Sequence, residues 1–396
     1  MFSVSVARFL VSSEGDTLIR QAESLAAARV SPVQALTALR KNASGDVAGA
    51  AWDMADLRRR AAAKIGPDSA RMYFDRDGYE MASAAPCAAY HASLFAAAGA
   101  ALVVDLCAGV GIDACGFGQA GIDVTGYEID PARAIFAEAN TVVLGLAERV
   151  VVHNSDATQA EIPLECEYAF FDPARRQGER KRIVYGDDLV PPLSLVHTLR
   201  MRGVTSTLAK LSPAVDRSIG DEIGGDLEFL SSCGECKEAL VRTGSLRSGT
   251  GVAAVLLDSG TRLDGPSAPP RVDARVGQFV YEPDPAVIRA GLVGNAAASV
   301  DGWLFDANVA YVMSDSKTTT PFATGYRVID SFPYHRKRLQ EALNSFGAGR
   351  LIVKRRAFPH EPEAIRKQMK LNGSLEATVI LTSEGSRLWA VIVERL

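Results

Sequence analysis

The sequence predicts an α/β protein built on a Rossmann-like sheet of mostly parallel strands with an antiparallel end. Three observations lead to this prediction. Short apolar runs, many of them β-branched, alternate with helical sequence after residue 101, which is typical of a parallel sheet covered by helices. A loop containing Gly109 and Gly111 follows the first run and opens a helix. Acidic residues stand at the ends of four successive runs.

Residues 1–66 are predicted to form a helical domain. They are rich in Ala, Leu and Arg, and their apolar residues recur every three to four positions. Ser31 before Pro32 is expected to cap one helix, with proline in its first turn. These residues contain no catalytic motif that we recognise, so we expect the helices to shape or cover a site formed elsewhere in the chain. Residues 67–100 connect them to the sheet and end in a predicted helix over 86–99.

Residues 67–262 are predicted to be the catalytic domain. The strands expected from apolar runs are 101–106, 122–128, 149–154, 168–171 and 204–211. Further runs at 227–232, 238–244 and 251–258 lie close together with turn residues between them. We expect these last strands to be antiparallel and to complete the sheet.

Residues 258–274 are rich in Gly, Pro, Ser and Asp, and are the best candidate for a linker. A C-terminal α+β module over 270–396, with its core at 330–396, is predicted to follow. The elements expected in it are helices at 283–298, 335–347 and 361–373, a strand at 350–358 and a hairpin over 376–396.

The bulk composition bounds the class of protein. A chain of 396 residues suggests two or three domains. No stretch approaches the roughly 18 uninterrupted apolar residues of a membrane helix, and the N-terminus has no basic region before its apolar start, so we expect neither a membrane span nor a signal peptide. Six scattered cysteines suit a reduced cytoplasm. The oligomeric state is left open.

The charge is distributed unevenly along the chain. The net charge is −4, yet residues 333–396 hold twelve Lys and Arg against six Glu and no Asp, which is +6. The remainder therefore carries −10. A basic C-terminal region on an acidic body favours a polyanionic partner, while an ordinary solvated surface is the alternative.

The four strand-end acids point to a cofactor crevice. Asp105 ends the first strand, and Glu128 ends the next one 23 residues later. A carboxylate there can accept both ribose hydroxyls of an adenosine-type cofactor. Asp156 after the third strand could hold the adenine edge, and Asp172 follows the fourth. A different nucleotide remains an alternative, although a pyrophosphate would favour a basic residue or a third glycine over Asp113, which follows the loop.

Four stretches carry a resemblance to a known family. DLCAGVG (105–111), YEIDP (127–131), NSDA (154–157) and the pair Asp172–Pro173 resemble motifs I to IV of class I S-adenosylmethionine-dependent methyltransferases. The first loop and the EIDP run, together with Asn140, resemble the branch that holds trimethylguanosine synthase and the bacterial guanine-N2 ribosomal RNA methyltransferases.

The chain from 67 to 396 is most similar to the bacterial methyltransferase family with a C-terminal THUMP-like domain. This resemblance rests on RMYFDRDGYEMAS (71–83), DPARR (172–176), AKLSP (209–213) and residues 351–373. It implies an RNA substrate and S-adenosylmethionine as cofactor. The residues that it implies for cofactor binding are Asp105, Cys107, Ala108, Gly109, Gly111, Glu128, Ile129, Asp156 and Ala157.

The catalytic residues expected from the resemblance are Asp172, Pro173 and Arg175. Asp172 would orient a nucleophile for in-line attack on the sulfonium methyl group, where positioning supplies most of the catalysis. A simple strand-end turn is the alternative for Asp-Pro. Amine methyltransferases usually continue with Pro and an aromatic residue, whereas this chain has Ala174 and Arg175. An arginine plane can stack on a base, so the target atom, an amine nitrogen or a carbon, is left open.

Basic residues near this motif and in the C-terminal module are expected to contact RNA. They are Arg176, Arg180, Lys181, Arg182, Lys210, Lys354, Arg355 and Arg356. No metal is expected, because the CGEC run at 233–236 has no second pair at metal-binding spacing and is better explained as a turn. Two other functions remain open: a methyltransferase for a small molecule or a protein, and a non-catalytic RNA-binding protein with this fold.

Overall fold

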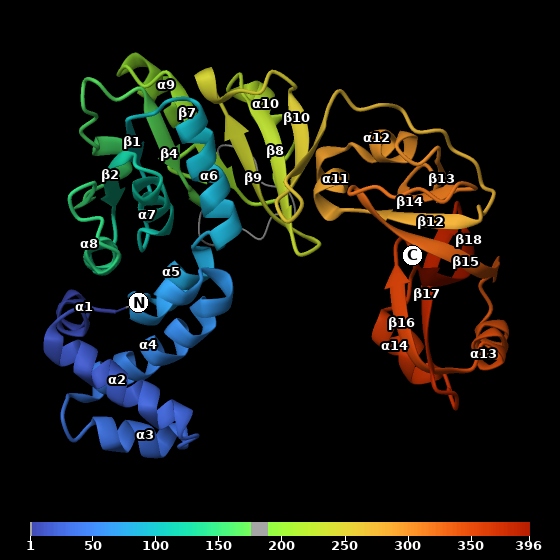
Figure 1. Cartoon of the computed structure of the whole chain (residues 1–396), viewed down its shortest axis with the longest axis horizontal. Coiled ribbons are helices and arrows are strands. Elements are labelled where there is room, and N and C mark those ends of the chain that lie inside the picture. Colours follow the sequence, from blue (N-terminus) through green and yellow to red (C-terminus); the bar gives the residue numbers. More distant parts are fainter. Residues whose placement is uncertain (1, 176–188) are drawn as a thin grey trace. The chain divides into compact units, whose positions relative to one another are not determined.

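The computed structural model describes residues 2–175 and 189–396. They form two compact units. Unit 1 comprises Met1–Leu227 and Ala239–Gly249, and unit 2 comprises Glu228–Glu238 and Thr250–Leu396. The helices of residues 1–66 therefore belong to the same unit as most of the predicted catalytic domain (Figure 1). The three-domain division expected from the sequence stays a prediction.

The N-terminal region is helical, as predicted. Its helices are α1 (Val4–Leu10), α2 (Ser13–Ala27), α3 (Pro32–Leu39) and α4 (Gly45–Lys64), followed by η1 (Pro67–Arg71) and α5 (Arg76–Met81). The cap expected at Ser31 is present, since its hydroxyl accepts a hydrogen bond from the Gln34 amide at 3.4 Å. Arg58 on α4 is buried and donates from Nε to the Met72 carbonyl at 2.8 Å. This bond fixes the segment that leads from the helices to the sheet.

The first sheet follows the predicted alternation. Its elements are α6 (Ala85–Ala97), β1 (Leu102–Asp105), α7 (Ile112–Gln119), β2 (Asp123–Glu128), α8 (Pro131–Val143), β3 (Val150–Asn154), η2 (Ala157–Gln159), β4 (Tyr168–Phe171), α9 (Leu195–Met201) and β7 (Ser206–Leu211). A small two-strand pair, β5 (Ala174–Arg175) with β6 (Leu189–Val190), is separate from this sheet. Strand β1 pairs in parallel with β2 and β4, and β3 and β7 extend the parallel region.

The end of the sheet is antiparallel, which confirms the predicted fold class. After α10 (Ile219–Glu222) come β8 (Asp226–Ser232), β9 (Glu235–Arg242), η4 (Gly244–Leu246), β10 (Val252–Leu256) and β11 (Thr261–Asp264). The complete strand order is β11-β10-β8-β9-β7-β4-β1-β2-β3. The linker expected at 258–274 is wrong in part, because β11 lies within it and pairs with β10. Arg262 of β11 is held there by an ion pair with the buried Glu228.

The C-terminal module of unit 2 is built on a second sheet, of order β13-β14-β12-β15-β18-β17-β16. Its elements are β12 (Phe279–Pro283), α11 (Pro285–Ala290), α12 (Val293–Ala298), β13 (Trp303–Asp306), β14 (Val309–Ser314), β15 (Ala323–Pro333), α13 (Arg336–Ser345), β16 (Ala348–Arg355), α14 (Pro362–Gln368), β17 (Leu375–Glu384) and β18 (Arg387–Arg395). The expected hairpin is confirmed, since β17 and β18 pair antiparallel.

Two helix predictions for this module are wrong in detail. The single helix expected at 283–298 is two helices, because Gly291 takes a left-handed conformation with φ of +73° and ends α11. The helix expected to reach residue 373 ends at Gln368, since Met369 is extended and packs into the core formed by α13, α14, β16 and β17. In the described part of the chain, no helix is long and apolar enough to cross a membrane.

Candidate active site at the carboxyl ends of the parallel strands

The loop after β1 is tight and places its backbone close to α8. Asp105 is 1% exposed and accepts a hydrogen bond from the Cys107 amide at 3.2 Å. Gly109 and Gly111 have φ values of +57° and +85°, which favour glycine. A Cβ at Gly111 would also lie 3.3 Å from the Cβ of Ala137 on α8. Both conformation and space therefore require glycine at 111.

Glu128 is tied to this loop from the end of β2. Its Oε2 accepts a hydrogen bond from the Gly109 amide at 2.8 Å, and its Oε1 accepts one from the Asp130 amide at 2.8 Å. Burial raises the pKa of Glu128, and the two amide bonds counteract this by stabilising the carboxylate. The carboxylate is thus fixed in orientation beside the loop, at the point where the two strands end.

The acids at the strand ends repel one another. Burial raises the pKa of Asp105 well above its usual value, and the charges of Asp113, Asp172 and Glu128 raise it further. Burial and the charges of Asp105, Asp172 and Glu128 likewise raise the pKa of the Cys107 thiol. A group of carboxylates that disfavour each other's ionisation favours the binding of a cationic ligand.

Asp113 at the start of α7 is held by two groups from the preceding segment. Its Oδ2 accepts a hydrogen bond from the Ser83 hydroxyl at 2.7 Å, and its Oδ1 lies 2.8 Å from Nδ1 of His91. Burial alone would raise the pKa of Asp113, but the hydrogen bond and charge of His91, with Lys210 and Ser83, lower it. No role is predicted for His91 from the sequence. Its partner lies 22 positions away, so no local spacing indicates this pair.

Asn140 on α8 connects the loop to the segment that precedes the sheet. The side chain is fully buried. Its Oδ1 accepts from the Tyr73 amide at 2.7 Å, and its Nδ2 donates to the carbonyls of Tyr73 at 3.0 Å and Val110 at 2.9 Å. One amide side chain therefore holds two segments distant in sequence in a fixed relation to the glycine loop.

Replacing Asn140 with alanine is expected to lower the free energy of unfolding of this part of the protein by about 3 kcal/mol, because three buried backbone groups lose their partner. Urea unfolding followed by circular dichroism measures this. Asn42→Ala, at an exposed position, is the matched control and should change the unfolding midpoint little. Equal midpoints for the two variants would contradict a structural role for Asn140.

Asp172 lies directly after β4 and is paired with a lysine of the neighbouring strand. Nζ of Lys210 on β7 lies 2.6 Å from Oδ2 of Asp172 and donates to the Met81 carbonyl at 3.0 Å. The register places Phe171 of β4 opposite Ala209 of β7, which brings the two side chains that follow together. Lys210 is 8% exposed. The structure thus places this predicted RNA contact at the ends of the parallel strands, beside the predicted catalytic acid.

A second lysine nearby was missed by the sequence analysis. Lys64, the last residue of α4, donates from Nζ to the carbonyls of Tyr79 at 2.8 Å and Glu80 at 2.9 Å. Burial and the charge of Lys210 lower the pKa of Lys64 to about 8. The two lysines together satisfy carbonyls at the end of α5, where helices leave acceptors unpaired. No pattern in residues 1–66 indicates this contact.

The other predicted cofactor residues lie at the ends of β2 and β3. Ile129 leaves an apolar side chain 68% exposed. Asp156 caps η2, accepting hydrogen bonds at Oδ1 from the amide and the hydroxyl of Thr158, both at 2.8 Å. Ala157 is buried. Arg175 is in β5, next to residues 176–188. The predicted contacts Arg176, Arg180, Lys181 and Arg182 lie outside the described residues.

The predicted basic contacts of the C-terminal module are all paired with acids. Lys354 Nζ bonds Glu282 at 2.6 Å, Arg356 lies 3.6 Å from the same carboxylate, and Arg355 pairs with Glu361. Cys233 and Gly234 of the CGEC run form the expected turn between β8 and β9, whereas Glu235 and Cys236 begin β9. Among the residues with described positions, no group of three or more His, Cys, Asp and Glu side chains could hold a metal ion.

The architecture agrees with that of a solved methyltransferase structure. A putative methyltransferase from Porphyromonas gingivalis W83 superposes with a TM-score of 0.74, covering 96% of this chain and 98% of that one at 19% identity. At that identity, the match establishes the shared fold over nearly the whole length, including the helices before the sheet and the module after it.

Sequence comparison adds the enzyme class. A protein described in two strains of Mycobacterium tuberculosis as an uncharacterised S-adenosylmethionine-dependent methyltransferase is 29% identical over 343 residues, covering 83% of this chain and 91% of the relative. Residues 323–395 match the THUMP domain-like family model. The chain is an S-adenosylmethionine-dependent methyltransferase with a C-terminal THUMP-like domain. The helices at 3–61 of this methyltransferase match a domain family of unknown function.

Proposed function

We propose that this methyltransferase modifies a base in structured RNA, a tRNA or an rRNA, and that the crevice at the strand ends is its active site. The observation that carries the site assignment is the convergence of Asp105, Glu128 and Asp172 at the carboxyl ends of β1, β2 and β4, adjacent in the sheet. Open α/β sheets bind their ligands at this edge.

The residues of the crevice fit S-adenosylmethionine. This cofactor supplies a methyl group on a positively charged sulfur, and it carries no phosphate. The buried acids around Asp105 provide a negative environment, and the loop from Asp105 to Gly111 contains no basic residue that would suit a pyrophosphate. In the proposal, the fixed carboxylate of Glu128 accepts the ribose hydroxyls. The exposed side chain of Ile129 offers an apolar surface to the adenine, and Asp156 lies near its edge.

Asp172 is proposed to orient the atom that receives the methyl group. Its carboxylate is held by an ion pair with Lys210 at 2.6 Å, which restrains the orientation of the carboxylate. Pro173 restricts the backbone of Asp172, the residue directly before it. A positioned acceptor can supply a large part of the rate enhancement when the methyl group is already activated.

An RNA substrate is supported by three features of the chain. They are the THUMP-like match at residues 323–395, the +6 charge of residues 333–396, and the motif resemblance to guanine-N2 RNA methyltransferases. The Ala174–Arg175 continuation, where amine methyltransferases usually have Pro and an aromatic residue, leaves both an amine nitrogen and a carbon as target atoms.

The substrate class is tested with labelled S-adenosylmethionine. The protein is incubated separately with total RNA, protein extract and metabolite extract from cells lacking its gene. We expect the label in RNA, and mass spectrometry of nucleosides then identifies the methylated base. Asp172→Ala is the matched catalytic control. Label confined to protein or metabolites would contradict the RNA assignment, and cofactor binding without any transfer would favour a non-catalytic RNA-binding protein.

The acid cluster predicts a pH dependence of cofactor binding. The pKa of Asp105 is raised, so this carboxyl is protonated at a pH where an ordinary aspartate, of pKa about 3.9, is ionised. A bound cation favours the ionised form. Cofactor affinity is therefore expected to fall as the pH is lowered through the raised pKa, with proton uptake when the cofactor dissociates. Titration calorimetry over this range measures it. Asp105→Asn should flatten the dependence, and a pH-independent wild type would contradict the proposal.

A further inference from the structure

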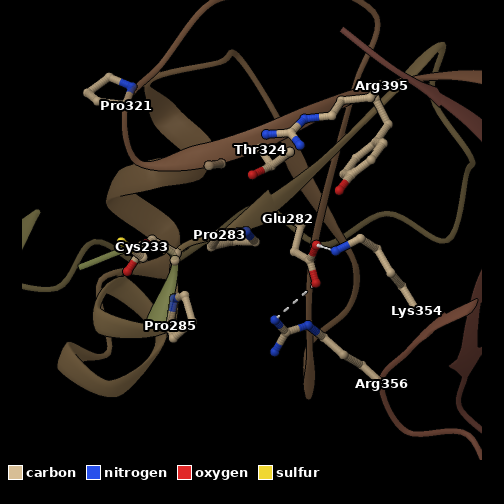
Figure 2. Close-up of a pocket in the computed structure, with 13 residues that line it drawn as sticks. Cys233, Glu282, Pro283, Pro285, Pro321, Thr324, Lys354, Arg356 and Arg395 are labelled. Atoms are coloured by element: carbon tan, nitrogen blue, oxygen red, sulfur yellow. Dashed lines mark hydrogen bonds and ion pairs between the residues drawn. The ribbon is translucent and has the colours of Figure 1, made fainter. Parts of the chain in front are cut away.

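A pocket of about 420 Å³ lies within unit 2, and none of the residues assigned to the active site lines it (Figure 2). It is formed by the turn after β8, the end of β12, the start of α11, one end of β15, and the ends of β16 and β18. Its volume is in the range of small-molecule sites, about 300–1,000 Å³. Most such sites are largely apolar, whereas three cationic side chains, Lys354, Arg356 and Arg395, line this one.

The strand register explains why these groups meet. Glu282 of β12 is opposite Thr324 of β15, and Tyr326 of β15 is opposite Arg395 of β18. Thr324 and Tyr326 are two residues apart on one strand and therefore face the same side. Lys354 comes from β16, four strands from β12 in the sheet order. Its contact with Glu282 at 2.6 Å requires the sheet to curve, since flat strands this far apart would be separated by about 19 Å.

The cations of the pocket are only partly neutralised. Glu282 bonds Lys354 and lies 3.6 Å from Arg356, which is an ion pair without a short hydrogen bond. Burial would lower the pKa of Lys354, but the hydrogen bond and charge of Glu282 raise it, so the ammonium stays charged. Asp284 is the second carboxylate that lines the pocket. It accepts hydrogen bonds from the Ser231 hydroxyl at 2.9 Å and from the Ala286 amide at 2.8 Å.

Donor groups remain for a ligand. The guanidinium carbon of Arg356 lies 5.3 Å from the ring centre of Tyr311, and the buried Nε of Arg356 has no hydrogen-bond partner among the described residues. Within the same part of the chain, Arg395 has no ion-pair partner. Figure 2 shows Lys354 and Arg356 pointing towards Glu282, and Arg395 extending towards Thr324. Two guanidinium groups, an ammonium and a threonine hydroxyl therefore line one pocket.

We propose that this pocket binds a phosphate group. Guanidinium groups recognise phosphate oxygens through paired hydrogen bonds, and lysine adds a point charge. Glu282 keeps the two neighbouring cations in place through its contacts with Lys354 and Arg356. The phosphate is carried either by RNA or by a free small molecule, and the chemistry of the pocket is the same for both. This inference does not depend on the identity of the methylated base.

Calorimetric titration of the full chain with inorganic pyrophosphate tests the proposal. We expect binding that weakens at least about tenfold in Arg395→Gln and in Lys354→Gln, since each variant loses a charge-assisted hydrogen bond. Arg350→Gln is the matched control, because Arg350 lies on the same strand as Lys354, pairs with Glu376 on the surface and does not line the pocket. Binding of S-adenosylmethionine should be unchanged in all three variants, which separates this test from that of the active site.

Competition with RNA identifies the source of the phosphate. If pyrophosphate displaces structured RNA from the wild type, and the two pocket variants bind RNA less tightly, the phosphate belongs to RNA. If the pocket variants lose pyrophosphate binding and keep wild-type RNA affinity, the ligand is a free phosphorylated molecule. Either result supports the proposal. Absence of pyrophosphate binding by the wild type, or equal binding by the pocket variants and the control, would overturn it.

Discussion

Replacement of Glu128 by alanine is expected to weaken S-adenosylmethionine binding by at least about 100-fold. The variant removes the carboxylate proposed to accept two ribose hydroxyls, and two charge-assisted hydrogen bonds contribute about 3 kcal/mol or more together. It also leaves the amides of Gly109 and Asp130 without their acceptor, so the glycine loop loses a restraint. Calorimetric titration of the variant with the cofactor or its demethylated product measures the loss.

The matched control is Glu138→Ala, on the exposed face of α8, which makes the same change of charge and should bind the cofactor normally. Glu128→Gln keeps the length and one acceptor oxygen, and an intermediate loss is expected. Circular dichroism shows whether each variant is folded. A folded Glu128→Ala that binds the cofactor as tightly as the wild type would exclude this crevice as the cofactor site.

The second large effect is expected at Asp172. Asp172→Asn should lower the rate of methyl transfer by about 10²–10³-fold, in line with the loss of one preorganised group at a reacting centre. Cofactor affinity should change by less than about tenfold, because Asp172 is proposed to face the target rather than the cofactor. Single-turnover transfer to RNA, with saturating cofactor, separates the two effects.

Variants of Lys210 test further whether Asp172 acts in methyl transfer. If its ion pair with Asp172 serves to hold that carboxylate, Lys210→Met should also slow transfer. The double variant should then be no slower than Asp172→Asn, because residues that act as one unit are not additive. Additive losses would show that Lys210 acts on its own, for example on the RNA. Normal transfer by Asp172→Asn would remove Asp172 from the mechanism.

The sheet and the strand-end acids could be predicted because their signals are local. Each short apolar run predicts a strand, and the acid that follows it marks the edge where parallel strands end together. Glu128 and Asp172 could thus be assigned to one crevice from sequence positions alone. The contacts that fix these two side chains could not be predicted from the sequence. The Gly109 amide bond and the Lys210 ion pair depend on how the loops and neighbouring strands pack.

The features that the sequence did not indicate depend on contacts between segments that are distant in the sequence. Lys64 reaches Tyr79 and Glu80 across a turn of the chain, and no residue type at that position distinguishes it from an exposed helix end. In the C-terminal module, helical spacing continues beyond Gln368, yet the buried side chain of Met369 is placed by tertiary packing in an extended conformation. Local propensity is overridden where burial favours another backbone.

The packing around the glycine loop determines whether the N-terminal helices can be removed from the enzyme. The apolar cluster that contains Val110, at the glycine loop, also contains Leu18 and Met54 of the N-terminal helices. A protein shortened to begin at residue 67 would expose that surface to water at the place where the cofactor loop has to be rigid. The N-terminal helices therefore cannot be removed without exposing the apolar surface beside the glycine loop. Exchanging them between relatives should succeed only when the loop and α8 are transferred as part of the same exchange.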